Sequence, residues 1–363
     1  MTIKNILLMG SALIGALTVA SGVKADDAPH VFYQLQSTLN LGGTGASYDH
    51  IDYDQNKHLA FLSRRADGLT VVDVNTNKVV AQVANAKGSG STAFAFKLDR
   101  GFTANTDGST SVFKLSDYSA VDRVPFGDNF DGVVYDEATN LLAFQQADNS
   151  KELLVDASTM KLVGTIEVEG TQLERPVVDG KSNLYIPMRD KHTVYKISLK
   201  DKKITAKWDV SAKCTEPSGS DFDVANNRLL LACRGKQVAP VLAVVDAESG
   251  AVTSTNVIAR GADDIILDPA SKQLFVAGGV DGVLNVFKQE GADKYTLTEA
   301  VQTNVGMRVM RFDTVSQKIY SMNASGVFDA AKKNLTAISP FYPNGYIPGS
   351  FNFYTFGRGP AAK

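Results

Sequence analysis

Charged and polar residues recur at one place in this 363-residue sequence, directly before or at the start of a short alternating segment that ends in Asp. The positions are Asp49, His50, Asp131, Glu174, Arg175, Ser218, Asp263, Asp264 and Arg308. Ionisable side chains are costly to bury unless they pair or contact a ligand. Because the planar guanidiniums of Arg175 and Arg308 suit carboxylates, this mixture predicts a site for a small polar or anionic ligand. An internal ring of salt bridges around a water-filled channel is an equal alternative.

A hydrolytic site of the lactonase kind is a second hypothesis for the same residues. His50 would act as the general base, and Glu174 and Arg175 would polarise a carbonyl. Only four histidines occur, however, and the motifs GxSxG, HExxH, GxGxxG and CxxCH are absent. We therefore leave catalysis uncertain and favour a non-enzymatic chain. Asp131, Asp263 and Asp264 have the chemistry for a hard cation. They come from separate segments, so we predict no metal site and no cofactor.

These positions belong to a repeat of about forty residues, a period typical of propeller blades. Each copy holds four short strand signals separated by turns rich in Gly, Asn, Asp and Ser. The copies are His50–Val83, Thr92–Val124, Asp131–Ile166, Glu174–Trp208, Pro217–Val257, Asp263–Val301 and Arg308–Ser339. No window shows sustained helical periodicity. The sequence predicts an all-β fold, a seven-bladed β-propeller of four-stranded antiparallel blades, with the charged positions at one mouth of its central channel.

An aspartate ends the third strand signal in four copies. These residues are Asp73, Asp156, Asp246 and Asp329. Each is followed closely by Thr, Ser or Lys, and an Asp side chain there accepts hydrogen bonds from turn N–H groups. Because the pattern repeats from copy to copy, we expect turn chemistry and not a functional site.

The two ends of the chain bear on how the ring closes. The segment Tyr33–Gly43 resembles the outer-strand segments of other copies, such as Lys78–Gly88, so we expect an N-terminal strand to close the last blade. Leu335–Ser339 also has the pattern of an outer strand of that blade. Either the last blade has five strands, or one of these two segments is not a strand. The tail Phe341–Phe356 holds seven aromatic residues. Since aromatic side chains favour burial, we expect the tail to pack across the closing blades.

The N-terminus follows the plan of a secretory signal peptide. Lys4 supplies the positive region, Ile6–Ala20 is apolar but too short to span a bilayer, and Ala25 offers a cleavage site. We expect residues 1–25 to be removed and residues 26–363 to form a single propeller domain. The mature chain is then periplasmic or secreted, without a membrane span, and we expect a monomer.

Composition and cysteine content narrow the partners further. The chain has 37 basic and 39 acidic residues and a formal net charge of −2, and no basic block tracks phosphates. Nucleic-acid binding therefore has no support from composition.

Cys214 and Cys233 are the two cysteines. In an oxidising compartment they predict one disulfide, since the spacing is not CxxC and no histidine lies near either. In the chain-entropy model a loop of this size stabilises the fold by about 3 kcal/mol.

Three stretches carry a family resemblance: KCTEPSGSDFDVANNRLLLACRG, GADDIILDPASKQLFVAGGVDGVLNVF and GMRVMRFDTVSQKIY. They resemble the YncE-like group of YVTN-type propeller proteins, and the paired cysteines of the first stretch are the most specific part. The YVTN tetrapeptide is absent, with LFVAGG and LYIPMR in its place. The resemblance implies an exported seven-bladed ring that serves in binding more often than in catalysis. Our first hypothesis is accordingly a binding propeller that recognises a small ligand or a partner protein at the channel mouth. The resemblance also implies a third hypothesis, single-strand nucleic-acid binding, which needs a basic face with stacking aromatics.

Overall fold

The computed structural model describes residues 31–43, 47–235, 238–333 and 343–359. The chain divides into two units, Met1–Val31 and Phe32–Lys363, and the fold described below belongs to the second. The expected signal peptide, residues 1–25, lies outside the described residues, as does Leu335–Ser339.

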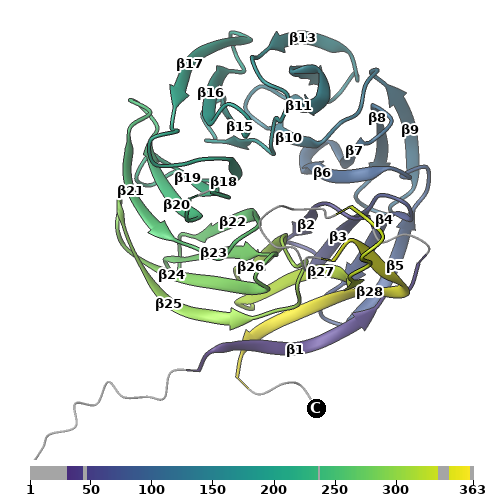
Figure 1. Ribbon diagram of the computed structural model, residues 1–363. Helices are drawn as coiled ribbons and strands as arrows, with labels where there is room; N and C mark the ends of the chain where they lie inside the picture. The colour runs from purple at the N-terminus through teal and green to yellow at the C-terminus, as the bar shows by residue number, and fades with distance from the viewer. Residues whose placement is uncertain (1–30, 44–46, 236–237, 334–342, 360–363) are drawn as a thin grey trace, which may run out of the picture. The chain divides into compact units, whose positions relative to one another are not determined.

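In the described residues, 28 strands form seven four-stranded antiparallel sheets, arranged as blades round a ring (Figure 1). The predicted seven-bladed β-propeller is confirmed. Blades 1 to 3 consist of β2 (Ile51–Asp54), β3 (Leu59–Arg64), β4 (Gly68–Asp73) and β5 (Lys78–Val83); β6 (Ser89–Ala95), β7 (Arg100–Asn105), β8 (Ser109–Lys114) and β9 (Ala120–Pro125); β10 (Gly132–Asp136), β11 (Leu141–Gln146), β12 (Lys151–Asp156) and β13 (Leu162–Glu167).

Blades 4 to 6 follow the same order. They consist of β14 (Val177–Val178), β15 (Asn183–Met188), β16 (Thr193–Ser198) and β17 (Lys203–Asp209); β18 (Pro217–Asp223), β19 (Arg228–Cys233), β20 (Val241–Asp246) and β21 (Val252–Val257); β22 (Ala262–Asp268), β23 (Gln273–Gly278), β24 (Val283–Gly291) and β25 (Lys294–Gln302). Helix in the described part of the chain is confined to two single-turn 3-10 segments, η1 (Phe96–Leu98) and η2 (Ala147–Asn149), as the lack of helical periodicity predicted.

Blade 7 joins the two ends of the chain in the order β26 (Met310–Asp313), β27 (Lys318–Val327), β28 (Gly345–Arg358) and β1 (Tyr33–Asn40). Closure by the N-terminal strand is therefore confirmed. β1 also reaches blade 6, because the Tyr33 N–H donates to the Glu299 carboxylate at 2.8 Å. Arg358 at the end of β28 pairs with the same carboxylate at 2.5 Å.

The third strand of blade 7 differs from the expectation. We expected the strand ending at Asp329 to be third, but β27 continues through Val327 and Asp329 lies beyond it. The aromatic tail supplies the third strand itself, as β28, and does not merely pack across the blades. Phe351, Phe353 and Phe356 in β28 are buried. Burial of this apolar strand between β27 and β1 outweighs the turn pattern that suggested the nearer segment.

The expected turn chemistry of the recurrent aspartates is present. The Asp73 carboxylate accepts the N–H groups of Asn75 and Thr76 at 2.8 and 3.1 Å. Asp156 and Asp246 accept N–H groups two and three residues ahead in the same way. Asp329, although outside a third strand, accepts the Ala331 N–H at 3.0 Å.

Neighbouring blades are tied together along their innermost strands. The Asp52 carboxylate in β2 accepts the Thr92 N–H of β6 at 2.8 Å. Asp264 in β22 likewise accepts the Met310 N–H of β26 at 3.0 Å. Carboxylates at the channel therefore have a structural role, joining blades that share no strand pairing.

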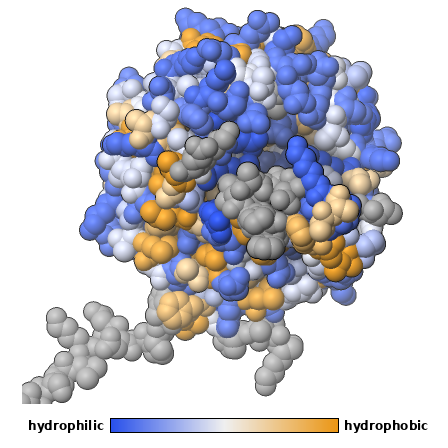
Figure 2. Space-filling model, in the orientation of Figure 1, coloured by the Kyte–Doolittle hydropathy of each residue, from blue (hydrophilic) through white to orange (hydrophobic). Residues whose placement is uncertain are grey.

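The outer surface varies in character round the ring. Figure 2 shows mostly hydrophilic residues over the blades at the top of the view and hydrophobic residues gathered in its lower half. In the described residues, no helix has the length and apolar composition that crossing a membrane requires.

Candidate functional site

The positions that begin the repeats meet at a cavity on the ring axis, which we call the polar cavity. Its volume is about 690 Å3. Six of the residues that the sequence singled out line it: Asp49, His50, Asp131, Glu174, Asp263 and Arg308. Ser218 lies beside it, buried, and its hydroxyl, which has one proton to donate, lies 3.0 Å from Glu174 Oε2 and 3.3 Å from Asp263 Oδ1. Residues from several blades thus meet at one mouth, as the repeat predicted.

The charged side chains of the polar cavity pair with one another. Asp263 accepts from Arg308 Nε at 2.5 Å and is also paired with Arg234. Glu174 pairs with Arg189 Nη1 at 2.5 Å. The ring of salt bridges that the sequence left as an alternative is therefore present.

Charge is unevenly distributed in this cavity. The side chains of Arg189, Arg234 and Arg308 are each 23 % exposed, so all three keep surface available. Arg189 pairs with Glu174, and Arg234 and Arg308 pair with Asp263. Arg308 Nη2 also lies 3.8 Å from Asp49 Oδ1. Burial lowers the pKa of Arg234, and the guanidiniums of Arg189 and Arg308 lower it further, although Glu174 opposes them. The lowered pKa therefore reflects burial first, and the closeness of the other two guanidiniums second.

The opposite half of the polar cavity is acidic. Asp49 pairs with Arg65, whose guanidinium reaches Asp131 only at 3.7 Å. Burial raises the pKa of Asp131 to about 7, and the carboxylates of Asp49 and Glu174 contribute to the increase. The cavity therefore has a positive side, from blades 4, 5 and 7, and a negative side, from blades 1 and 3.

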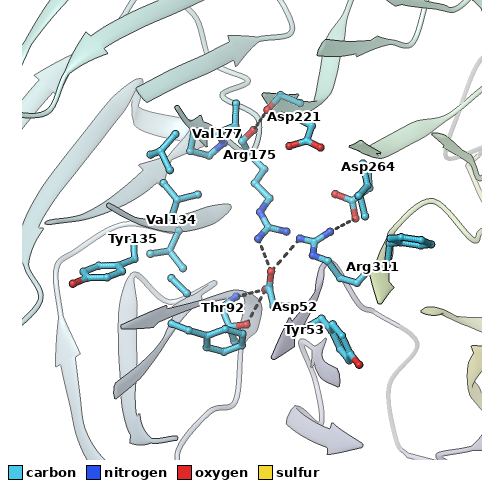
Figure 3. Close-up of a pocket in the computed structure, with 18 of the residues that line it drawn as sticks. Asp52, Tyr53, Thr92, Val134, Tyr135, Arg175, Val177, Asp221, Asp264 and Arg311 are labelled. Atoms are coloured by element: carbon cyan, nitrogen blue, oxygen red, sulfur yellow. Dashed lines mark hydrogen bonds and ion pairs between the residues drawn. The ribbon is translucent and has the colours of Figure 1, made fainter. Parts of the chain in front are cut away.

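Arg175 and Asp264 lie elsewhere. They line a second cavity on the axis, of about 520 Å3, to which the innermost strands of all seven blades contribute; we call it the apolar-walled cavity (Figure 3). Arg175 Nη2 donates to Asp52 Oδ1 at 2.5 Å, and Arg311 bridges Asp52 at 3.0 Å and Asp264 at 3.1 Å. Neighbouring residues of an extended segment alternate in direction, so Glu174 and Arg175 serve different cavities.

His50 stands between the two cavities. Its ring lines the polar cavity with 7 % of the side chain exposed, and its Nδ1 lies 3.7 Å from Asp264 Oδ1. On the other side its Nε2 lies 3.9 Å from Asp49 Oδ1. Burial acts to lower the pKa of His50, but Asp49 and Asp264 outweigh it and raise that pKa. A layer of charged side chains therefore stands between the two cavities.

Two cavity arginines, Arg189 and Arg234, were not among the sequence candidates. Each directly follows the second strand of its blade, in the segments LYIPMR and LLLACR, and Arg65 follows Arg64 at the same point of blade 1. This recurrence was a usable signal. Our candidates were restricted to the start of each innermost strand, and these arginines follow the second strand of their blades. The fold brings both places to the same mouth.

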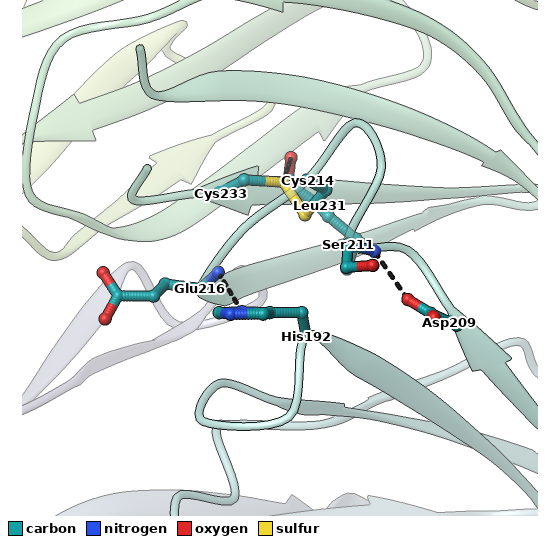
Figure 4. Close-up of a disulfide and its surroundings, with 7 residues drawn as sticks. All are labelled: His192, Asp209, Ser211, Cys214, Glu216, Leu231 and Cys233. Carbon is teal, nitrogen blue, oxygen red and sulfur yellow. Dashed lines mark hydrogen bonds between the residues drawn. A yellow bond between two sulfur atoms is a disulfide. The ribbon is translucent and has the colours of Figure 1, made fainter. Parts of the chain in front are cut away.

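The disulfide that the sequence predicted fixes the position of Arg234. Cys214 and Cys233 are bonded and fully buried, and Arg234 follows the second cysteine (Figure 4). The loop before β18 is held to the same strand end, since the Arg234 N–H donates to the Glu216 carbonyl at 3.0 Å. The bond thereby anchors one wall of the polar cavity.

The geometry bears on the hydrolase and metal hypotheses as well. His50 and Glu174 line the polar cavity, whereas Arg175 lines the other, so the three proposed catalytic side chains do not share a cavity. In the part of the chain that the structure describes, no three His, Cys, Asp or Glu side chains are grouped as metal ligands. The Asp263 carboxylate, one of the candidate cation ligands, forms ion pairs with Arg234 and Arg308.

Comparisons with known proteins support the fold. No family model matches the chain, and no curated protein matches its sequence. A chain of the Kuenenia stuttgartiensis hydrazine synthase superposes with a TM-score of 0.68 at 12 % identity, covering 78 % of this chain and 95 % of that one. A chain of a mitotic checkpoint complex superposes with a TM-score of 0.69 at 10 % identity, covering 86 % and 96 %. At these identities the likeness shows a shared propeller fold and nothing about activity.

Proposed function

We propose that this chain is an exported, non-enzymatic binding protein whose polar cavity recognises a small ligand carrying a carboxylate or similar anionic group. One observation carries the proposal: three guanidiniums, from Arg189, Arg234 and Arg308, converge from three blades on one cavity, and each side chain is 23 % exposed. An anion placed among them would accept hydrogen bonds from their exposed N–H groups. Arginine forks bind carboxylates through paired hydrogen bonds, which supplies both affinity and orientation.

The negative side of the cavity adds selectivity to this proposal. A ligand whose anionic group meets Arg234 would direct its remaining polar groups toward Asp131 and Asp49. Donors such as hydroxyl or amino groups suit those carboxylates, whereas a second anionic group there would be repelled. The preferred ligand therefore has one anionic end and one hydrogen-bond-donating end.

The exported location and the family are part of the same proposal. The Cys214–Cys233 bond supports an oxidising compartment. The sequence stretches named above support a place among the YncE-like propeller proteins. The hydrolase alternative has less support, because its candidate residues are divided between two cavities.

Calorimetry with small hydroxycarboxylates tests the proposal. Arg234→Gln removes the guanidinium at the centre of the positive side, while Asp263 keeps its 2.5 Å pair with Arg308. A charged hydrogen bond is worth about 1.5–3 kcal/mol, so the affinity should fall about tenfold or more. Arg100→Gln, on β7 outside both cavities, is the matched control and should bind normally. Equal affinity for wild type and Arg234→Gln would contradict the proposed site.

A further inference from the structure

The apolar-walled cavity differs from the polar cavity in a way that points to a different ligand. Its sides carry aromatic and aliphatic residues, including Phe94, Phe96, Tyr135 and Ile266. Phe96 is 48 % exposed at this end of the ring, and its ring centroid lies 5.7 Å from that of Phe94. Exposed and half-buried aromatic side chains around a concavity on the axis suit an apolar ligand body.

The floor of this cavity holds charged groups in unequal number. Arg175 and Arg311 are its guanidiniums, and Asp52, Asp221 and Asp264 are its carboxylates (Figure 3). Both guanidiniums are paired, Arg175 with Asp52 and Arg311 with Asp52 and Asp264. Asp264 also lies 3.7 Å from His50, whose pKa is raised, so one carboxylate of this floor has no ion pair among the described residues.

Asp221 is that carboxylate. Within the described chain its hydrogen bonds come from backbone: the Phe222 N–H donates to Oδ1 at 2.8 Å and the Leu267 N–H to Oδ2 at 2.7 Å. Burial raises the pKa of Asp221 to about 6 against these two donors, and the carboxylate of Asp264 raises it further. The electrostatic environment at this point favours an added positive charge.

We propose that the apolar-walled cavity binds a small organic cation, a protonated primary amine attached to an aromatic or branched apolar body. The ammonium group lies at Asp221, where it supplies the positive charge that this carboxylate lacks among the described residues. The apolar body lies against Phe94, Phe96 and Tyr135, whose ring faces also attract a cation.

This site is separate from the one in the proposed function, because the ligand has the opposite charge and occupies the other cavity. The layer formed by His50 and Asp264 separates the two. Failure of carboxylate binding at Arg234 would therefore leave the amine proposal standing, and the converse also holds.

A series of ligands with the same body and different charge tests the proposal by calorimetry on the full chain. The probes are 2-phenylethylammonium, 2-phenylethanol and 3-phenylpropionate, at a neutral pH above the pKa of Asp221. We expect the ammonium compound to bind about tenfold more tightly than the alcohol, and the carboxylate to bind most weakly. Equal binding of all three, or tighter binding of 3-phenylpropionate through Arg175, would overturn the proposal.

Two variants locate the bound amine. Asp221→Asn removes this negative charge and should weaken ammonium binding about tenfold while leaving the alcohol little changed. Because this change also replaces an acceptor of two N–H groups, thermal unfolding must show that the variant folds. Phe96→Ala, on an exposed side chain, carries no such risk and should weaken both the ammonium compound and the alcohol severalfold.

Asp122→Asn on β9 is the matched control, since it removes one exposed carboxylate outside both cavities. It should leave ammonium binding unchanged. If Asp122→Asn weakens binding as much as Asp221→Asn, the attraction belongs to the net charge of the chain and the proposed site is wrong.

Discussion

Glu152 gives the sharpest prediction about stability. This residue of β12 is fully buried in blade 3, and its described hydrogen bond is the one that Gln145 Nε2 donates to Oε1 at 2.6 Å. Oε2 has no partner among the described residues. Burial raises the pKa of the Glu152 carboxyl from 4.5 to about 8, although the bond from Gln145 opposes the increase. Glu152 is therefore a neutral acid in the folded chain at neutral pH.

The sign of the pH dependence follows from where the proton is held. Between 4.5 and about 8 the folded chain keeps the proton that the unfolded chain releases. The contribution of Glu152 to the free energy of unfolding is fully present below pH 4.5. It falls as the pH rises from 4.5 to about 8 and stays constant at higher pH. One pKa unit corresponds to about 1.4 kcal/mol, so the total loss is at most about 5 kcal/mol.

Glu152→Gln keeps the shape and the acceptor for Gln145 but cannot ionise. We measure the free energy of unfolding by urea denaturation. Near pH 4.5 the variant should match the wild type, and toward pH 8 the variant should become progressively more stable than the wild type. Taking the difference between the two chains cancels the titration of His50 and Asp131. Glu167→Gln, an exposed change on the neighbouring strand β13, should show no such trend. A difference that stays constant with pH would refute the assignment of a buried neutral acid.

Two further predictions concern covalent and backbone constraints. Replacing Cys214 and Cys233 by serine should lower the free energy of unfolding by about 3 kcal/mol, measured by denaturation, and should also weaken carboxylate binding because Arg234 loses its anchor. Gly250 has a φ of +76°, and an added Cβ would lie 2.1 Å from the ring of Trp208. Gly250→Ala should therefore lower the melting temperature more than Gly180→Ala does, since Gly180 has a φ of +71° with open space around it. An equal decrease in melting temperature for the two alanine variants would show that the contact with Trp208 does not destabilise Gly250→Ala.

The fold was readily predicted because each blade repeats the same local chemistry. The turn aspartates and alternating strands recur within about forty residues, so seven weak signals reinforce one another. The seventh copy was the exception. Its third strand, β28, follows β27 only after a long insertion, and sequence reasoning assigned the nearer segment that ends at Asp329. Local pattern cannot show which of two apolar segments will pair with a distant strand.

The polar cavity was predicted in part. Asp49, Glu174 and Asp263 could be predicted, because each lies at the start of the innermost strand of its blade and the repeat places those starts at one end of the channel. The same reasoning grouped Asp264 with Asp263, although consecutive side chains on a strand point in opposite directions. Their separation into two cavities follows from that alternation and could have been anticipated. The pairing of Arg234 with Asp263 could not, because it joins two blades.

The strand that completes blade 7 has a consequence for the order of folding. Of the described strands, β1 is made first and its partner β28 last. Each of the first six blades can form from contacts within one stretch of chain, whereas this pairing must close a loop round the whole ring, and long-range closure is slow. Until it does, the edge of β28 is unpaired and open to other chains. We expect ring closure to limit the rate of folding, and a chain lacking Tyr33–Asn40 to associate with its own copies.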